Sequence, residues 1–210
     1  MTAITVIRIN NKNTCTNQSQ LILTNLVYNF LYCLNGDYPN FGQWFFDKVI
    51  NGFNNGTREI LVASSSDNIV GVAILKKSPN EKKICTLRVH EHHQRNGIGS
   101  LLITEAIRIL DTETPIITVA SFRSKQFMPL FNKFGFKLTE ICVNYYGKGT
   151  AEYAYNGLLN KYEIPSPSSP QELISPYSEI VRLTTATNFV ISSGLASQTD
   201  IPNLSATMRA

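Results

Sequence analysis

The chain has 210 residues, of which 43% are hydrophobic and 16% charged, and its formal net charge is +4. This composition is that of an ordinary globular protein, and no apolar run approaches the roughly 18–20 residues that a membrane-spanning helix needs. Because the first ten residues also lack the basic and then continuously apolar order of a secretory signal, we expect a cytoplasmic protein with no membrane partner.

The first predicted elements are a strand and two helices. Residues Thr2–Ile9 alternate apolar and polar side chains, which predicts an edge strand. After the polar loop Asn10–Ser19, the stretch Gln20–Leu34 is apolar at helical spacing and is followed by Asn-Gly, a helix stop. Residues Phe41–Phe53 carry a stripe of large apolar side chains at helical spacing, which predicts a second helix packed on the core.

Three strands and another helix follow. Short polar turns separate Arg58–Ser64, Ile69–Lys77 and Lys82–Val89, so we expect an antiparallel meander with a bulge at Gly71. The strongly apolar stretch Gly97–Leu110 predicts a helix.

The remaining elements complete an α+β domain. A β-rich run at Pro115–Ser121 precedes a predicted helix at Ser124–Lys133, and Gly135–Tyr145 with Glu152–Leu159 reads as a closing hairpin. The predicted order over residues 1–160 is β-α-α-β-β-β-α-β-α-β-β. This order favours a mixed, mainly antiparallel central sheet flanked by helices.

The composition changes after this domain. Ile164–Pro176 holds four prolines and four serines, which predicts a linker over residues 161–176. Residues 177–210 are rich in Ser, Thr and Ala and have only scattered apolar positions. We expect a C-terminal tail that is either disordered or packed on the domain.

The charge balance and the positions of the cysteines indicate which kinds of ligand to expect. Residues 1–160 carry 16 Lys and Arg against 11 Asp and Glu, a mildly basic balance that suits a polyanionic ligand such as a nucleotide cofactor. It does not by itself indicate nucleic acid. The four cysteines are far apart and have no close histidine partner, which predicts free thiols and no metal site.

One segment combines features of a phosphate-binding site. A strand ending near Val89 leads through a polar turn into Gly97-Ile98-Gly99, which opens a helix. The first amides of a helix have no intrahelical partner and carry partial positive charge, and glycines let a ligand approach the backbone. We therefore expect an anion site here, with Arg95 at its rim. The alternative is a loop whose glycines serve only a sharp turn; neither a Walker loop nor a dinucleotide fingerprint is present.

The segment Gln94-Arg95-Asn96-Gly97-Ile98-Gly99 resembles the Q/R-x-x-G-x-G/A signature of the GCN5-related N-acetyltransferase (GNAT) superfamily. It follows a strand and opens an apolar helix, as in that superfamily. A second segment, Leu130 to Phe136, is similar to the family's L-Y/F-x-x-x-G-F motif. The resemblance covers roughly residues 3–159 and implies a sheet that splits after the strand ending at Val89, with acyl-CoA lying in the split.

The resemblance also implies a set of cofactor-binding residues. Main-chain groups of Leu87, Arg88 and Val89 would pair with the pantetheine arm of acetyl-CoA like an added strand. The helix beginning at Ser124 and containing Phe131 would flank the thioester end. Main-chain amides of the signature loop would hold the pyrophosphate, namely those of Gln94, Arg95, Asn96, Gly97, Ile98, Gly99 and Ser100.

The catalytic groups stay open at this point. Many relatives have a tyrosine where this chain has Phe131, so the usual general acid cannot be carried over. Tyr145 and Tyr146, like Tyr153 and Tyr155, are on the predicted closing strands and could replace it. Glu59 and Glu152 could relay a proton from the amine. Other candidate bases are the loop residues His90, Glu91, His92 and His93.

The expected reaction moves an acetyl or short acyl group from acyl-CoA to a primary amine by direct attack in a ternary complex. The acceptor side falls in residues 20–56, where the candidates for lining a pocket are Asp37, Tyr38, Trp44, Phe45 and Phe46. Two other functions stay open: a non-catalytic acyl-CoA-binding module, and a transferase directed at RNA or aminoacyl-tRNA, which Lys76, Lys77, Lys82 and Lys83 could serve. A homodimer is common in the superfamily.

Overall fold

A computed structural model describes residues 3–11, 17–66 and 68–159. The predicted linker and tail, residues 161–210, lie outside the described part of the chain. Within it, all strands join one sheet in the order β1-β2-β3-β4-β5-β7-β6. Every neighbouring pair is antiparallel except β4 with β5, which is parallel. The predicted α+β fold with a mainly antiparallel sheet is confirmed.

The strands occupy nearly the predicted positions. The first half supplies β1 (Thr5–Ile9) and then, after the first helices, three strands joined by short turns: β2 (Arg58–Ser65), β3 (Asn68–Ser78) and β4 (Glu81–Val89). The second half supplies β5 (Ile116–Ala120), β6 (Leu138–Val143) and β7 (Ala151–Tyr155). The strands of the predicted closing hairpin are shorter than expected, because Gly135 and Asn144 adopt positive φ and end the extended conformation.

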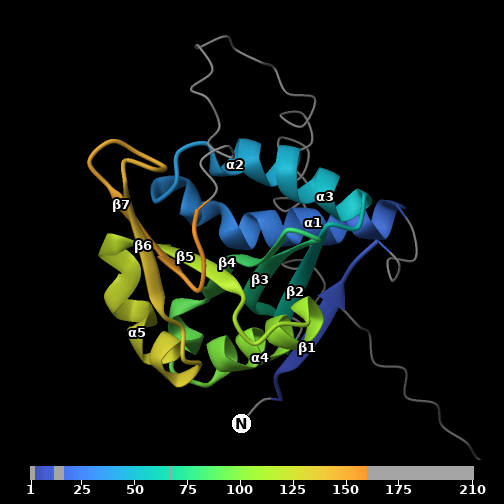
Figure 1. Ribbon diagram of the computed structural model, residues 1–210. Helices are drawn as coiled ribbons and strands as arrows, with labels where there is room; N and C mark the ends of the chain where they lie inside the picture. Colours follow the sequence, from blue (N-terminus) through green and yellow to red (C-terminus); the bar gives the residue numbers. More distant parts are fainter. Residues whose placement is uncertain (1–2, 12–16, 67, 160–210) are drawn as a thin grey trace, which may run out of the picture. The chain divides into compact units, whose positions relative to one another are not determined.

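Helices cover both faces of the sheet (Figure 1). One face carries α1 (Asn17–Leu31), the 3₁₀ turn η1 (Tyr32–Gly36), and a second helical segment that runs through α2 (Phe41–Trp44), the π-helix η2 (Phe45–Ile50) and α3 (Asn51–Asn54). The predicted helix at Phe41–Phe53 is thus present but widened in its middle to π geometry. Its apolar stripe is buried as expected, with Phe45, Val49 and Phe53 inaccessible to solvent.

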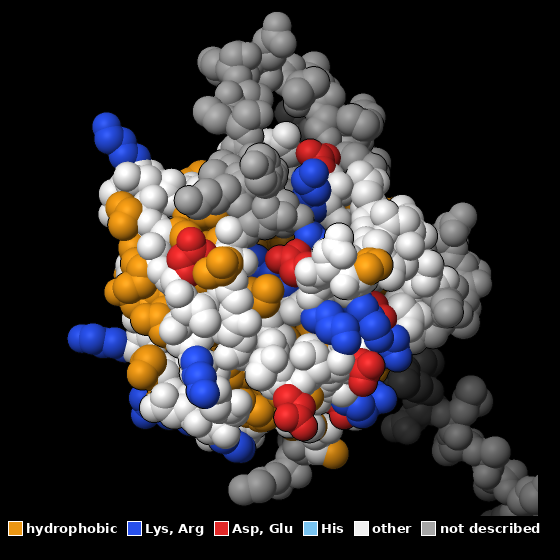
Figure 2. All heavy atoms as spheres, in the orientation of Figure 1, with side chains coloured by type: hydrophobic (Ala, Val, Ile, Leu, Met, Phe, Trp, Pro, Cys, Tyr) orange, Lys and Arg blue, Asp and Glu red, His pale blue; other side chains and the backbone are white. Residues whose placement is uncertain are grey.

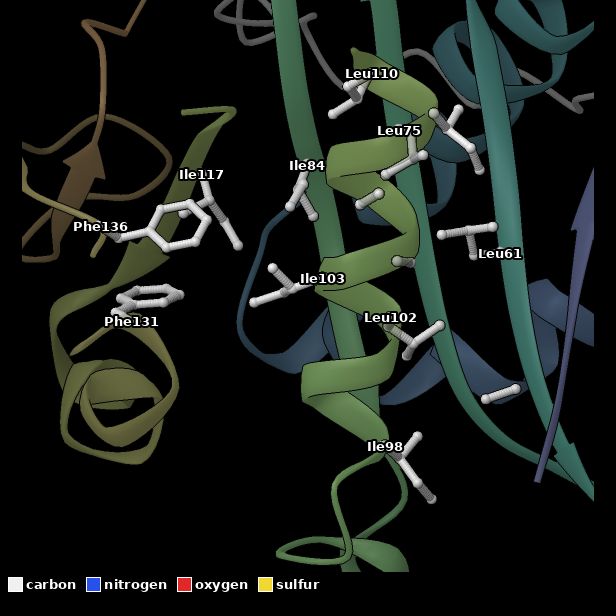
Figure 3. Packing of buried hydrophobic residues seen from close by; sticks show 14 of the residues in the cluster. Leu61, Leu75, Ile84, Ile98, Leu102, Ile103, Leu110, Ile117, Phe131 and Phe136 are labelled. Carbon is white, nitrogen blue, oxygen red and sulfur yellow. The ribbon is translucent and has the colours of Figure 1, made fainter. Parts of the chain in front are cut away.

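The other face carries α4 (Ile98–Leu110) and α5 (Ser124–Lys133), preceded by the 3₁₀ turns η3 (Glu91–His93) and η4 (Ser121–Arg123). Figure 3 shows Ile98, Leu102 and Ile103 on the side of α4 that faces the strands, toward Leu61, Leu75 and Ile84. A side chain at Gly71 on β3 would meet Ile98 and Leu102 at 3.0 Å. The glycine therefore lets the first turn of α4 lie close on the sheet.

Candidate active site

The sheet opens between β4 and β5. Within the described residues, the two strands pair only at Lys83 with Ile116 and at Ile84 with Ile117. The rest of β4, up to Val89, therefore has no strand on that side. A bulge lies where the strands part: Ile84 and Thr86 oppose consecutive residues of β3, so Cys85 is the extra residue.

Strand geometry fixes which main-chain groups of β4 face the opening. The amide of His90, just beyond β4, donates to Val70 O on β3 at 2.9 Å. Since successive residues of a strand turn their amides to opposite edges, Val89 and Leu87 direct theirs toward the opening. Arg88 instead faces β3 with its main chain, and its guanidinium donates to Phe30 O on α1 at 2.8 Å. Of the three predicted pantetheine-binding residues, Leu87 and Val89 thus turn main-chain groups to the edge, where Val89 O already accepts from the Gln94 side chain at 3.2 Å.

A loop with unusual backbone angles connects β4 to α4. Arg95 and Gly97 adopt positive φ values of 62° and 80°, and α4 starts at Ile98. The first amide of this region that finds an internal acceptor is that of Leu101, which donates to Gly97 O at 3.0 Å. In the described part of the chain the amides of residues 95–100 donate to no protein acceptor. Six adjacent amides are therefore available to an anion.

Gln94 differs from the six residues that follow it. Its amide donates to Glu91 O at 3.3 Å, so it is not free for a ligand. Its side chain donates to Val89 O at 3.2 Å and accepts from Gln126 Nε2 at 3.1 Å. Gln94 thereby links the end of β4 to α5, which makes it a positioning residue for the loop.

Positive charge lies beside the free amides. Lys133, at the end of α5, donates to Ser100 Oγ at 3.1 Å, and Arg95 is exposed in the loop. Lys133 and Gln126 are not among the site residues predicted from the sequence. Both belong to a helix 26 or more residues downstream, and no local pattern indicates that they meet this loop.

Two residues predicted to flank the thioester are engaged elsewhere. Phe131 is 1% exposed and packs against Phe127, Phe136 and Tyr155, with ring centroids 4.5–5.5 Å apart. It belongs to the core between α5 and the sheet. The hydroxyl of Ser124 donates to Ser121 O at 2.7 Å, so it serves the turn that starts α5.

The catalytic candidates separate into two groups. Glu59 is on β2, two strands away from β4, and forms an ion pair with Arg8 on β1. Tyr145 is buried with Ala154 and Leu159 and adjoins the second group, because its ring meets the Tyr146 ring edge to face at 4.7 Å. Glu91 and His92 are about four-fifths exposed beside the loop. Glu152 and Tyr146, in contrast, lie together with Tyr38 near the end of β5.

Glu152 is the centre of this second group. It stands on β7 opposite Ala120 of β5 and is 4% exposed. Burial raises the pKa of its carboxyl group to about 7, although a hydrogen bond from Thr118 and the charge of Lys83 act the opposite way. Burial and the charge of Glu152 in turn raise the pKa values of Tyr38 and Tyr146. These two rings meet edge to face at 5.4 Å.

The segment before α2 is tied to the end of β5. Ala120 N donates to the Tyr38 hydroxyl at 3.3 Å, and Arg123 donates to both carboxylate oxygens of Asp37 at 3.1 Å. Asp37 and Tyr38, named in the sequence as acceptor-side candidates, are thus held beside Glu152. Trp44 lies instead near Arg58, with its ring 5.8 Å from the guanidinium.

The lysines of the β3–β4 hairpin have partners within the chain. Lys76 pairs with Glu81, while Lys77 and Lys82 donate to Ile109 O and Asp111 O, each at 2.6 Å, at the end of α4. Figure 2 shows Lys and Arg side chains standing beside Asp and Glu side chains on one face, without a uniform basic patch. These lysines are accounted for by contacts within the fold.

Two further properties concern the described residues. No helix among them is long and apolar enough to cross a bilayer. None of their His, Cys, Asp and Glu side chains gather in a group of three that could hold a metal ion.

Comparisons with known proteins agree with this architecture. A family model described as "Acetyltransferase (GNAT) domain" matches residues 41–149. No curated protein sequence matches the chain. A Bacillus subtilis acetyltransferase solved in complex with CoA has a TM-score of 0.51 at 19% identity, covering 75% of this chain and 100% of that one.

Two other solved structures have similar scores. A GNAT-family protein from Desulfovibrio desulfuricans has a TM-score of 0.51 at 15% identity, with 73% of this chain and 97% of that chain covered. The ribosomal-protein-S18-alanine N-acetyltransferase of Escherichia coli has a TM-score of 0.50 at 15% identity, with 75% and 97% covered. These structures share the fold. With the family match over more than half of its length, the chain belongs to the GNAT acetyltransferase family.

Proposed function

We propose that the chain is an acetyl-CoA-dependent N-acetyltransferase that acts on a primary amine by direct attack in a ternary complex. The single observation that carries the proposal is the row of six amides at residues 95–100 without a protein acceptor. They lie at the first turn of α4 and next to the unpaired edge of β4. Helix-start amides of this kind bind phosphate oxygens.

The unpaired main-chain groups of the loop and of the β4 edge match successive parts of acetyl-CoA. The amides of residues 95–100 would hold the diphosphate, with Arg95 and Lys133 supplying charge. The amide of Val89 and the main-chain groups of Leu87 would pair with the amide groups of the pantetheine arm. From Val89 to the bulge at Cys85 the strand runs about 13 Å, at roughly 3.3 Å per residue, a span that suits an extended arm. Acetyl-CoA supplies a thioester carbon open to attack.

Attack by an amine on the thioester sets three chemical requirements. The amine must be uncharged and placed near the thioester, and the departing thiolate must gain a proton. The bulge and the end of β5 border the place where the sheet opens. We assign the activity to residues 1–160. The location in the cytoplasm and a homodimer stay predictions, as does the absence of a metal.

Calorimetry with acetyl-CoA tests the proposal. We expect saturable binding by the full chain, and about tenfold weaker binding by Gly97→Ala, because a side chain at φ 80° costs about 1–2 kcal/mol and shifts the amides. Gly36→Ala is the matched control, since Gly36 has open space around it and no positive φ. Absence of heat with the wild-type chain would refute the proposal.

A second candidate function is an acyl-CoA-binding module without turnover. It is favoured by one observation, the phenylalanine at position 131 and its burial in the core, which leave no hydroxyl at the position of the family tyrosine. CoA release from acetyl-CoA with a broad panel of amines, peptides and aminoacyl-tRNA separates the two. Binding without release above background across that panel would favour the module.

A further inference from the structure

The polar cluster at the end of β5 contains one buried carboxylate oxygen without a hydrogen-bond partner. Among the buried side-chain atoms of the described residues, Glu152 Oε1 has no hydrogen-bond donor. A buried carboxylate oxygen that has lost water and gained no donor destabilises a fold. The other buried polar side-chain atoms of the described residues have hydrogen-bond partners. The unpaired oxygen of Glu152 therefore indicates a ligand that carries a hydrogen-bond donor or a positive charge.

The position of Glu152 connects it with the proposed reaction. Its register partner on β5 is Ala120, beyond the point where β5 parts from β4. Glu152 and Cys85 both lie close to the Tyr146 side chain, so the carboxylate and the β4 bulge border the same ring. Glu152 therefore lies near the end of the opening that an acyl group on the pantetheine arm would reach.

Two tyrosine side chains, those of Tyr38 and Tyr146, lie close to Glu152. Tyr38 reaches the end of β5 from the segment between η1 and α2, where its hydroxyl accepts from Ala120 N at 3.3 Å. Tyr146 meets it edge to face. Aromatic faces next to a carboxylate are suited to an ammonium group with a short apolar stem.

We propose that Glu152, flanked by Tyr38 and Tyr146, is the acceptor site, in which its carboxylate binds the ammonium form of a primary amine and takes its proton. This inference rests on the proposed acetyl transfer. The ion pair between Asp37 and Arg123 joins the segment that carries Tyr38 to the turn after β5. Asp37 and Arg123 therefore act as positioning residues for Tyr38.

The proton and electron balance is complete without another reactant. The ammonium gives one proton to Glu152, and the nitrogen lone pair then forms the C–N bond to the thioester carbon while the C–S bond breaks. The electron pair of that bond leaves on sulfur, and the second nitrogen proton passes to the thiolate. Amide and thiol are the products, and Glu152 returns its proton to solvent.

The groups that face Glu152 set its titration. Thr118 and Lys83 favour the carboxylate, while burial favours the acid, so the pKa of about 7 falls where a base is half ionised near neutral pH. Tyr38 and Tyr146 are neutral there, because burial and Glu152 raise their pKa values. Asp37 and Arg123 neutralise each other. The rate of transfer should rise with pH through about 7 and then level off.

Infrared difference spectroscopy tests the site without turnover. The spectrum of the wild-type chain minus Glu152→Gln, taken near about pH 6 where the acid form dominates, should show a protonated carboxyl band. Adding n-butylammonium chloride should remove the band, because the ammonium favours the carboxylate. Sodium chloride at the same concentration, which supplies neither an N–H donor nor an apolar stem, should leave it. The inference would be overturned if n-butylammonium left the intensity of the band unchanged, or if both salts removed the band equally.

Two measurements separate this inference from the function on which it rests. Glu152→Gln should bind acetyl-CoA with the wild-type affinity in calorimetry, whereas its rate of CoA release with an accepted amine should fall by about 100-fold or more. A wild-type rate and pH profile in Glu152→Gln would overturn the acceptor site alone. Failure of the wild-type chain to bind acetyl-CoA would refute the proposed function instead.

Discussion

Replacing Glu152 by glutamine should change how the stability of the protein depends on pH. The carboxyl pKa is 4.5 in the unfolded chain and about 7 in the folded protein. The folded state therefore binds this proton more tightly, and the resulting stability is fully present below the unfolded pKa and lost as pH rises through the folded one. Glutamine keeps the shape and cannot ionise.

The size of the effect follows from the two pKa values. Each unit of difference corresponds to about 1.4 kcal/mol, so the shift from 4.5 to about 7 gives about 3 kcal/mol across the full window. Relative to the variant, the wild-type chain should lose about 2–3 kcal/mol of unfolding free energy between about pH 5 and about pH 8. Other titrating groups cancel in this difference, since the two proteins share them.

Urea unfolding of both proteins at a series of pH values measures the difference directly. Glu59→Gln is the matched control, because the Glu59 carboxylate is already paired with Arg8. A difference between wild type and Glu152→Gln that stays constant across the series would refute the reasoning. It would mean that Glu152 keeps an ordinary pKa and has a donor or solvent in the folded protein.

Three further substitutions test how the site is held. Gly71→Ala should destabilise the protein by about 1–3 kcal/mol in urea unfolding and weaken acetyl-CoA binding, because the new methyl group lies 3.0 Å from Ile98 and Leu102 under the first turn of α4. Phe131→Tyr should lower the unfolding free energy by about 1–3 kcal/mol without raising the rate of CoA release, since the ring is 1% exposed in the core. Arg123→Gln should cost less than about 1 kcal/mol of stability yet speed amide hydrogen exchange between Leu34 and Trp44, because it frees that segment from the end of β5.

Each of these expectations has a contrary result. Unchanged stability in Gly71→Ala would show that α4 does not approach β3 as closely as the packing requires. A gain of activity in Phe131→Tyr would place that ring at the reacting atoms after all. Unaltered exchange in Arg123→Gln would mean that the Tyr38 hydrogen bond alone holds the segment.

Local sequence determined the elements and the loop that precedes α4. Hydrophobic periodicity located the strands and helices to within a few residues, because the period of two or of 3.6 is imposed by which side chains must be buried. Gly97 and Gly99 before an apolar helix indicated free amides, because helix starts leave amides unpaired whatever surrounds them. The π geometry at Phe45–Ile50 carried no such signal.

The tertiary structure decided which of the candidate residues meet. Glu59 and Glu152 look alike in sequence, each a carboxylate on a predicted strand. Pairing places Glu59 next to Arg8 on β1 and Glu152 between β5 and β6, in a buried site where one oxygen has no donor. Tyr38 reaches Glu152 from the segment between η1 and α2, and Gln126 and Lys133 reach the loop before α4 from α5. Local patterning fixes the period and the ends of an element, whereas the identity of its neighbours depends on strand order and helix packing across the whole chain, which no short stretch of sequence encodes.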